Sequence, residues 1–264
     1  MLFNIGDLVT RKSHNNDTVF KIINIENEIA ILKGVNIRLI ADSSISDLVH
    51  VDKSLEQDLI KDDRSIINRM NDLINLNRDE YFYLPGKILH IDADKDYLDR
   101  CMKFYKEMNV LSYGVTLKEK DVASSLNEIL ERIKPDILVI TGHDAYYNKD
   151  GDYTNMSNYK NSDNFIQAVK VARSYEKDHD KLIVIAGACQ SNYEELIKAG
   201  SNFASSPKRI NIHALDPAII AASVSLSSKN KDIDLIKILG KTKYGTDGMG
   251  GIITNGTMYI GYPR

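Results

Sequence analysis

From residue 87 onward, the sequence alternates between short apolar runs and longer segments whose apolar residues recur at helical spacing. The apolar runs cover residues 88–92, 110–117, 137–140, 182–186 and 209–213, and the helical segments cover residues 95–109, 119–132, 161–176, 191–199 and 216–224. Strands that are apolar throughout are typical of parallel sheets buried on both faces, and the helices between them supply that cover. The pattern predicts an α/β fold, a mostly parallel sheet flanked by helices, over residues 87–264.

The first fifty residues have a different pattern. Five short runs rich in β-branched residues, at 8–10, 19–23, 29–34, 37–41 and 48–51, are separated by polar turn signals. Short strands joined by tight turns are typical of small antiparallel barrels. We therefore expect an SH3-like β-barrel over residues 1–52. Because such a barrel brings no chemistry of its own, a docking or stabilising role is the simplest expectation.

Two further segments complete the predicted organisation. Residues 53–86 are polar and charged with apolar residues at helical spacing, which predicts a helical linker of one or two helices. We expect this linker to end in a loop at residues 81–86, where Pro85-Gly86 signals a turn. Residues 245–261 hold six glycines and are expected to form a loop or an edge hairpin.

Composition excludes several classes of protein. Hydrophobic residues make up 43% of the chain and the formal net charge is −3, so there is material for a core and no basic excess for nucleic acid. The two cysteines, Cys101 and Cys189, cannot build a disulfide framework, and no Cys/His cluster has zinc-site spacing. We expect no signal peptide, no membrane partner, no metal and no cofactor, and a cytoplasmic protein with both thiols free.

A cysteine and a histidine follow two consecutive apolar runs of the predicted sheet. His143 follows the run at 137–140, and Cys189 follows the run at 182–186. In an open parallel sheet, ligands bind beyond the carboxyl ends of the strands. If the two strands are neighbours, the side chains start about 5–10 Å apart. An imidazole beside a thiol can generate the thiolate and later protonate a leaving amine, so Cys189 and His143 are the candidate catalytic pair.

The residues beside this pair suit acyl transfer. Gly187 and Ala188 are small, so they let a substrate backbone approach Cys189. The N–H of Cys189, which precedes a predicted helix, is one candidate to stabilise an oxyanion. Gly142 and Asp144, on either side of the histidine, are the region from which a second donor is expected.

Other polar residues near the predicted edge have competing roles. Asp92 and Asp94 lie at the end of the run at 88–92, where they orient His143, line the cleft or cap the next helix. His213 ends the run at 209–213 and is a weaker candidate to line a cleft. Cys101 and His90 lie in apolar patterns and are expected to be packed side chains. Four tyrosines in the loop after the histidine either flank the cleft or hold the loop in place: Tyr146, Tyr147, Tyr153 and Tyr159.

The sequence around the pair resembles the caspase-like cysteine peptidases. That family carries an Ala-Cys pair with its histidine about 50 residues upstream. Gly187-Ala188-Cys189-Gln190-Ser191 matches the Ala-Cys-Gln core of the family's motif, and His143 lies 46 residues before Cys189. The flanking Gln and Gly of the motif are absent, and His143-Asp144 replaces the usual His-Gly. The resemblance implies a caspase-like peptidase domain at residues 87–264 and leaves the second oxyanion donor, such as the Asp144 N–H, in doubt.

Over nearly its full length, the chain resembles the YabG family of sporulation-specific cysteine peptidases. The matching stretches are residues 5–13, 89–94, 141–144 and 187–191. The resemblance implies a peptidase that cleaves after Arg or Lys and processes spore coat or cortex-lytic precursor proteins in the mother cell. It leaves association with the spore and self-cleavage open.

Cleavage after a basic residue requires a carboxylate in the pocket that receives the basic side chain, because a buried guanidinium needs a paired acceptor. Asp144, Asp216 and Asp247 are the candidates for this acid, and the sequence does not separate them. Asp216 has a competing role as the N-cap of the helix that begins at Pro217.

Two other classes of function compete with the peptidase. Asp92, Asp94 and an Asp after the third strand resemble the phosphate-accepting site of a receiver domain. A receiver also needs Ser or Thr after the fourth strand and Lys after the fifth, where this chain has Cys189 and Asp216. A catalytically inactive scaffold is the other alternative, and it predicts an unreactive Cys189.

Overall fold

The computed structural model describes residues 3–51, 63–70, 81–147 and 152–262, which fall into two compact units, Met1–Ser65 and Ile66–Arg264. The boundary between the units lies inside the predicted linker. A helix occupies residues 63–68, and the rest of the predicted helical segment lies outside the described residues. The limits of the three predicted domains stay a prediction.

The first unit is a five-stranded antiparallel sheet. Its strands are β1 (Leu8–Arg11), β2 (Phe20–Glu26), β3 (Ile29–Gly34), β4 (Ile40–Ser44) and β5 (Leu48–His50), in the order β4-β3-β2-β1-β5. One face of the sheet buries a small apolar core made of Val9, Phe20, Ile22, Ala30, Leu32 and Leu48. Five strands are confirmed, but the fourth is Ile40–Ser44 rather than residues 37–41, and the SH3-like form of the barrel stays a prediction.

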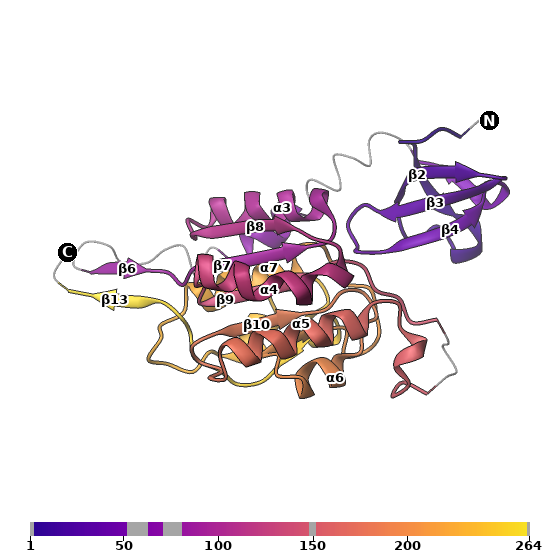
Figure 1. Cartoon of the computed structure of the whole chain (residues 1–264). Helices are drawn as coiled ribbons and strands as arrows, with labels where there is room; N and C mark the ends of the chain where they lie inside the picture. Colours follow the sequence, from indigo (N-terminus) through magenta and orange to yellow (C-terminus); the bar gives the residue numbers. More distant parts are fainter. Residues whose placement is uncertain (1–2, 52–62, 71–80, 148–151, 263–264) are drawn as a thin grey trace. The chain divides into compact units, whose positions relative to one another are not determined.

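The second unit is built on a six-stranded sheet (Figure 1). Its strands are β7 (Ile88–Asp92), β8 (Ser112–Thr116), β9 (Ile137–Thr141), β10 (Ile183–Ala186), β11 (Phe203–Ser205) and β12 (Met249–Gly251), in the order β12-β11-β10-β9-β7-β8. Only β12 runs antiparallel to its neighbour. The structure therefore confirms a mostly parallel sheet, and the caspase-like arrangement stays a prediction.

Helices cover both faces of this sheet. They are α3 (Lys95–Glu107), α4 (Glu119–Ile133), α5 (Ser162–Tyr175), α6 (Tyr193–Lys198), α7 (Asp216–Ser225) and α8 (Leu235–Leu239). One buried cluster packs α3, α7 and α8 against the sheet, and the other packs α4, α5 and α6 against the opposite face. Because every residue of β7, β9 and β10 is buried, the continuous apolar runs reflect this two-sided cover. No helix among the described residues is both long and apolar enough to cross a membrane.

Several predicted elements differ from the structure. The fifth parallel strand is Phe203–Ser205, whereas residues 209–213 form an irregular segment, so the prediction of a strand there is wrong. The alternation of Ile210 and Ile212 suggested a strand, but this segment crosses the sheet edge and bonds to the loop after β10.

The two ends of the second unit also pair with each other. Part of the loop predicted at 81–86 is strand β6 (Phe82–Leu84), which pairs with β13 (Tyr259–Gly261). The glycine-rich tail therefore supplies β12 at the edge of the main sheet and β13 in a separate two-stranded sheet. The strands that pair with β12 and β13 are β11 and β6, and both are far away in the sequence. Turn signals alone could therefore not reveal either pairing.

Candidate active site

The predicted pair leaves one edge of the sheet from neighbouring strands. β9 and β10 are paired in parallel, with Ile140 opposite Ala186. His143 follows the end of β9 by two residues, and Cys189 follows the end of β10 by three. The neighbouring strands assumed from the sequence are therefore confirmed (Figure 1), and both residues follow the carboxyl ends of these strands.

A tight turn carries Cys189. Gly187 has φ of 106°, and Gln190 has φ of 58°. A Cβ at Gly187 would lie 2.4 Å from Ser205 Oγ, so glycine is required there both for its φ and for space. The N–H of Ala188 donates to Ser191 Oγ at 2.9 Å, which closes the turn around the cysteine.

The thiol of Cys189 is buried beneath the segment formed by residues 206–215. The N–H of Ile212 donates to Cys189 Sγ at 3.3 Å. The same segment is fastened to the turn because the N–H of Gln190 donates to Ile210 O at 3.1 Å and Ser206 Oγ donates to Ile210 O at 2.8 Å. Cys189 Sγ also donates to Ile212 O at 3.8 Å, so the segment contacts the thiol through both a donor and an acceptor. The donated N–H favours the thiolate over the thiol, but the cover leaves Cys189 with no exposed surface.

His143 is fixed at its ring and at its backbone. Its Nε2 lies 3.1 Å from Asp94 Oδ2, and its N–H donates to Glu119 Oε1 at 2.8 Å. Its Nδ1 is buried and has no hydrogen-bond partner among the residues that the structure describes. A carboxylate at Nε2 favours the tautomer that is protonated there, so Nδ1 is the nitrogen available to take a proton.

A buried network supports Asp94. Its other oxygen, Oδ1, accepts the N–H of Asp96 at 2.9 Å and so caps α3. The Asp94 N–H donates to Asp92 Oδ1 at 2.9 Å, and Thr141 Oγ1 donates to Asp92 Oδ2 at 2.8 Å. His90 lies below them, fully buried, with Nε2 3.0 Å from Thr141 Oγ1. Asp94 therefore both caps the helix and holds His143, the two roles that the sequence left open.

The backbone N–H groups after β9 differ in whether they have a hydrogen-bond acceptor. His143 gives its N–H to Glu119, and Tyr146 gives its N–H to Gln190 Oε1. The N–H of Asp144 has no acceptor among the described residues. Gly142 is tightly enclosed, because a Cβ there would lie 2.6 Å from Glu119 Oε1. Asp144 therefore offers the N–H that an incoming oxyanion could use.

The three acids considered for a basic pocket lie in different environments. The buried Asp144 carboxylate accepts hydrogen bonds from Ser162 Oγ, Ser191 Oγ and the N–H groups of Asn161 and Ala145. Burial raises the pKa of Asp144 despite these bonds.

Asp216 and Asp247 differ from Asp144 and from each other. Asp216 is buried and accepts the N–H groups of His213 at 2.9 Å and Lys243 at 2.8 Å. It is the first residue of α7, with Leu215 as the N-cap, so the prediction of an Asp216 N-cap is wrong. Asp247 is exposed in the 3-10 turn η4 (Gly245–Asp247).

Comparison with known proteins identifies the family. The family model described as YabG peptidase U57 matches residues 4–263. The chain belongs to the YabG peptidase family. The sporulation-specific protease YabG of Bacillus subtilis is 42% identical over 286 aligned residues, which cover 100% of this chain and 99% of that protein. No solved structure matches the chain. This YabG-family chain is therefore a peptidase of a sporulation family.

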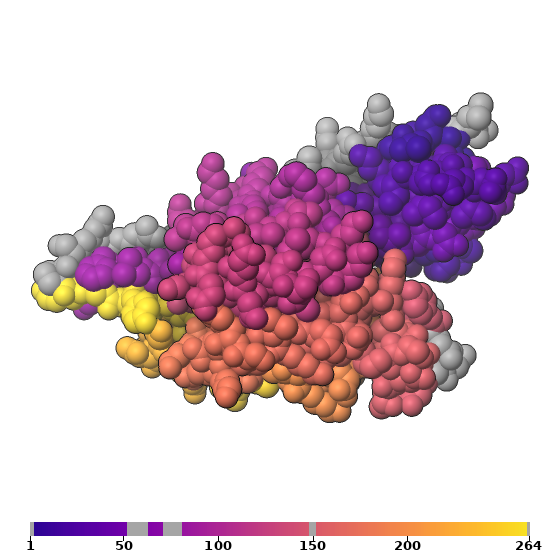
Figure 2. Space-filling view, in the orientation of Figure 1, coloured from indigo at the N-terminus to yellow at the C-terminus, as the bar shows by residue number. Residues whose placement is uncertain are grey.

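The sequence reasoning missed a charged contact beside the site of this YabG-family peptidase. Arg209 Nη2 forms an ion pair with Glu194, in the first turn of α6. Arg209 Nε also donates to Tyr159 Oη at 2.9 Å. The sequence indicates the four loop tyrosines but gives no sign of Glu194, because residues 153, 159, 194 and 209 come together only in the folded chain. The described part of the tyrosine loop, residues 152–160, forms a lobe of the surface beside α6 (Figure 2).

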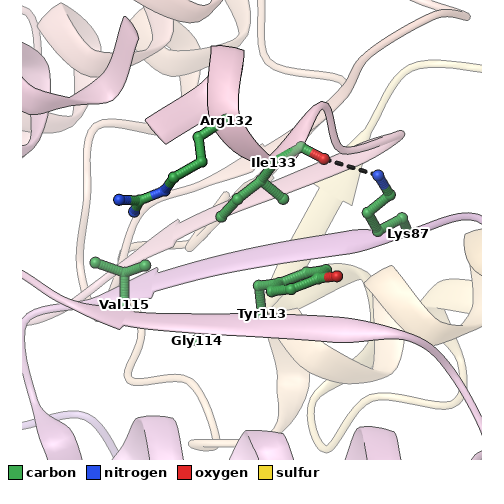
Figure 3. A pocket seen from close by; sticks show the side chains of 6 residues that line it. All are labelled: Lys87, Tyr113, Gly114, Val115, Arg132 and Ile133. Atoms are coloured by element: carbon green, nitrogen blue, oxygen red, sulfur yellow. Dashed lines mark hydrogen bonds between the residues drawn. The ribbon is translucent and has the colours of Figure 1, made fainter. Parts of the chain in front are cut away.

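A separate pocket of about 420 Å³ lies between β8, an edge strand of the six-stranded sheet, and the end of α4 (Figure 3). Its lining residues are Lys87, Tyr113, Gly114, Val115, Arg132 and Ile133. Lys87 Nζ donates to Ile133 O at 2.7 Å across its rim. None of the candidate catalytic residues of the YabG-family chain lines this pocket, and the described residues hold no group of three metal-ligating side chains.

Proposed function

We propose that this YabG-family peptidase is a cysteine endopeptidase in which Cys189 is the nucleophile and His143 is the general base and acid. The observation that carries the proposal is the histidine's geometry. Paired strands bring the two residues to one edge, and Asp94 occupies Nε2, which leaves Nδ1 to exchange a proton. The proposed chemistry requires no metal and no organic cofactor.

The reaction follows acyl transfer through a thioester. Nδ1 of His143 takes the thiol proton, Cys189 Sγ bonds to the scissile carbonyl carbon, and Asp94 stabilises the imidazolium. The N–H groups of Cys189 and Asp144 stabilise the oxyanion. As the C–N bond breaks, His143 returns its proton to the leaving amine. Water, deprotonated by His143, then releases the acid product and restores the thiol.

The proposed substrates are proteins cleaved after Arg or Lys, namely spore coat or cortex-lytic precursors in the mother-cell cytoplasm. The resemblance of the sequence to the family supports this proposal, and the Bacillus subtilis relative is a sporulation-specific protease. Self-cleavage is part of the same proposal, because the chain itself carries exposed basic residues such as Lys231.

The competing functions lack comparable support. A receiver domain needs a hydroxyl after β10 and a lysine after the next strand. The first of these positions holds the buried Cys189; the next strand is β11, so Asp216, which follows an irregular segment, does not occupy the second. An inactive scaffold gives no reason for the Asp94–His143 arrangement.

The test is cleavage of an Arg-containing reporter peptide by four purified proteins: wild type, Cys189→Ala, His143→Ala and Cys101→Ala. We expect the first two substitutions each to lower kcat/KM by about 10³-fold or more. Cys101→Ala is the matched control, because it removes the other buried thiol, and we expect it to keep activity. Full activity in Cys189→Ala would overturn the proposal.

A further inference from the structure

We infer that Glu194, Tyr153 and Tyr159 form a subsite for a guanidinium side chain of protein substrates, and that the chain's own Arg209 fills this subsite while its segment covers Cys189. The inference rests on the proposed cysteine peptidase. It adds two points to that proposal: Glu194 is the acid that selects a basic residue, and Arg209 occupies the subsite and so keeps Cys189 covered.

The contacts of Arg209 define the ligand chemistry. Its guanidinium carbon lies 5.5 Å from the centre of the Tyr153 ring and 5.7 Å from that of Tyr159. The guanidinium pairs with Glu194 and donates to Tyr159 Oη. A carboxylate combined with aromatic faces is the environment that a planar cation prefers. Although burial lowers the pKa of Arg209, its bonds to Glu194 and Tyr159 outweigh burial and leave that pKa raised.

The tyrosine walls are held by contacts that do not involve Arg209. The Tyr146 ring stacks on Tyr153 with centres 5.1 Å apart and lies 4.9 Å from Tyr159. Tyr159 Oη donates to Tyr153 O at 3.0 Å, and Asn192 Nδ2 donates to the same oxygen at 3.1 Å. The subsite therefore keeps its walls when the arginine leaves, so another guanidinium can enter.

The subsite is connected directly to the proposed nucleophile. Tyr146, which backs both rings, donates its N–H to the side chain of Gln190, the residue after Cys189. Glu194 lies on α6, which follows the same turn. A substrate side chain held by Glu194 therefore belongs to a peptide that runs past Cys189.

Arg209 and the cover over the thiol are parts of one segment. Ile212, three residues beyond Arg209, donates its N–H to Cys189 Sγ. Ser206 and Arg209 have φ of 61° and 53°, a left-handed backbone that L residues rarely adopt, so the segment is strained in this position. The Glu194 side chain is 54% exposed, whereas that of Arg209 is 11% exposed, so water reaches the carboxylate and weakens the ion pair. A substrate arginine that displaces Arg209 would release the strained segment and uncover the thiol.

The first experiment measures the rate at which iodoacetamide alkylates Cys189 in full-length wild type, Arg209→Ala, Arg209→Lys and the control Lys208→Ala. Lys208 is the exposed basic neighbour of Arg209. We expect alkylation to be at least tenfold faster in Arg209→Ala, intermediate in Arg209→Lys and unchanged in Lys208→Ala. Equal rates in all four proteins would overturn the role of Arg209 as the occupant.

The second experiment compares Arg209→Ala with Arg209→Ala/Glu194→Gln. Both proteins are assayed with matched reporter peptides that carry Arg or Ala before the scissile bond. We expect Glu194→Gln to raise KM for the Arg peptide at least tenfold and to leave kcat unchanged. An Arg preference that survives Glu194→Gln would overturn the subsite. Calorimetric binding of Nα-acetyl-arginine methylamide to both proteins needs no turnover: we expect it to bind only where Glu194 is present. If Cys189 proves dispensable for cleavage, the proposed function fails, while the alkylation and binding results still decide the subsite.

Discussion

The two thiols of this peptidase lie in two regions that look alike by burial and differ in hydrogen bonding. Cys101, in the middle of α3, and Cys189, in the turn after β10, are both fully buried in the same apolar cluster. Both also contact one segment: Cys101 Sγ donates to Ala214 O at 3.5 Å, whereas Cys189 Sγ donates to Ile212 O at 3.8 Å and also accepts the N–H of Ile212 at 3.3 Å. A carbonyl stabilises the protonated thiol, and an N–H stabilises the thiolate.

The backbone around the two residues differs as well. Cys101 is fixed in a regular helix, whereas Cys189 sits between two residues with positive φ, in a turn that only Gly187 permits. Strained turns at the end of a strand are typical of functional sites. Burial and a bond to a carbonyl therefore do not separate a packing thiol from a proposed nucleophile; the N–H donated to Cys189 Sγ and the backbone conformation of its turn do.

The largest expected effect concerns Asp94, which bonds to the histidine proposed to act on Cys189. Asp94→Asn removes the charge at His143 Nε2, so we expect kcat for an Arg reporter peptide to fall by about 10²–10⁴-fold. Asp99→Asn is the matched control, since Asp99 is an exposed carboxylate of the same helix that pairs with Lys95. Equal activity of the two variants would remove Asp94 from the mechanism.

The next largest effect is expected on stability, in the turn that holds Cys189. Gly187→Ala forces a Cβ against Ser205 Oγ at positive φ, so we expect it to lower the free energy of unfolding by about 2–4 kcal/mol. Gly245 also has positive φ but has open space around it, so Gly245→Ala should cost only about 1 kcal/mol. Urea unfolding of both variants measures the difference, and equal losses would contradict a turn built around close packing.

The region around Cys101 should respond as a packing site. Removing a buried sulfur leaves a small void, so Cys101→Ala should lower the free energy of unfolding by about 1 kcal/mol. Cleavage of the Arg reporter should stay within about twofold of wild type, because single conservative changes away from the site leave the chemistry intact. A large loss of kcat with an unchanged melting temperature would mean that Cys101 takes part in catalysis.

The smallest expected effect concerns pH and the acid that holds the Cys189 turn. Ser191 Oγ donates to Asp144 Oδ2 while it accepts the N–H of Ala188. Because burial raises the folded-state pKa of Asp144, the folded protein binds this proton more readily than the unfolded chain does. The contribution of Asp144 to stability should therefore rise as pH falls through its raised pKa toward the ordinary pKa of an aspartate. Comparing unfolding free energies of wild type and Asp144→Asn at pH 7 and pH 5 tests this, and the opposite slope would contradict it.

The sequence predicted the elements that depend on local patterns. Continuous apolar runs identified β7, β9 and β10, helical spacing identified α3, α4 and α5, and the order of these elements placed Cys189 and His143 on one edge. Burial on both sides leaves a clear signal in the sequence, because each strand must be apolar along its whole length.

Long-range contacts left no comparable signal. The strand β11 is only three residues long, and the pairing of β6 with β13 joins segments far apart in the chain. The roles of Glu194 and Arg209 depend on an irregular segment that no periodicity marks. Asp216 fits the pattern of an N-cap before Pro217, but its carboxylate bonds to His213 and Lys243 instead.

The most direct test of the contrast between the two thiols is to map the site of an arginine-directed affinity label. Wild-type protein is incubated with a peptidyl-arginine chloromethyl ketone, digested, and analysed by mass spectrometry for alkylation of Cys101 and Cys189. The proposed mechanism predicts that Cys189 carries the label, that Cys101 does not, and that His143→Ala loses the labelling. A label on Cys101, or none on either thiol in a preparation that cleaves the Arg reporter, would contradict it.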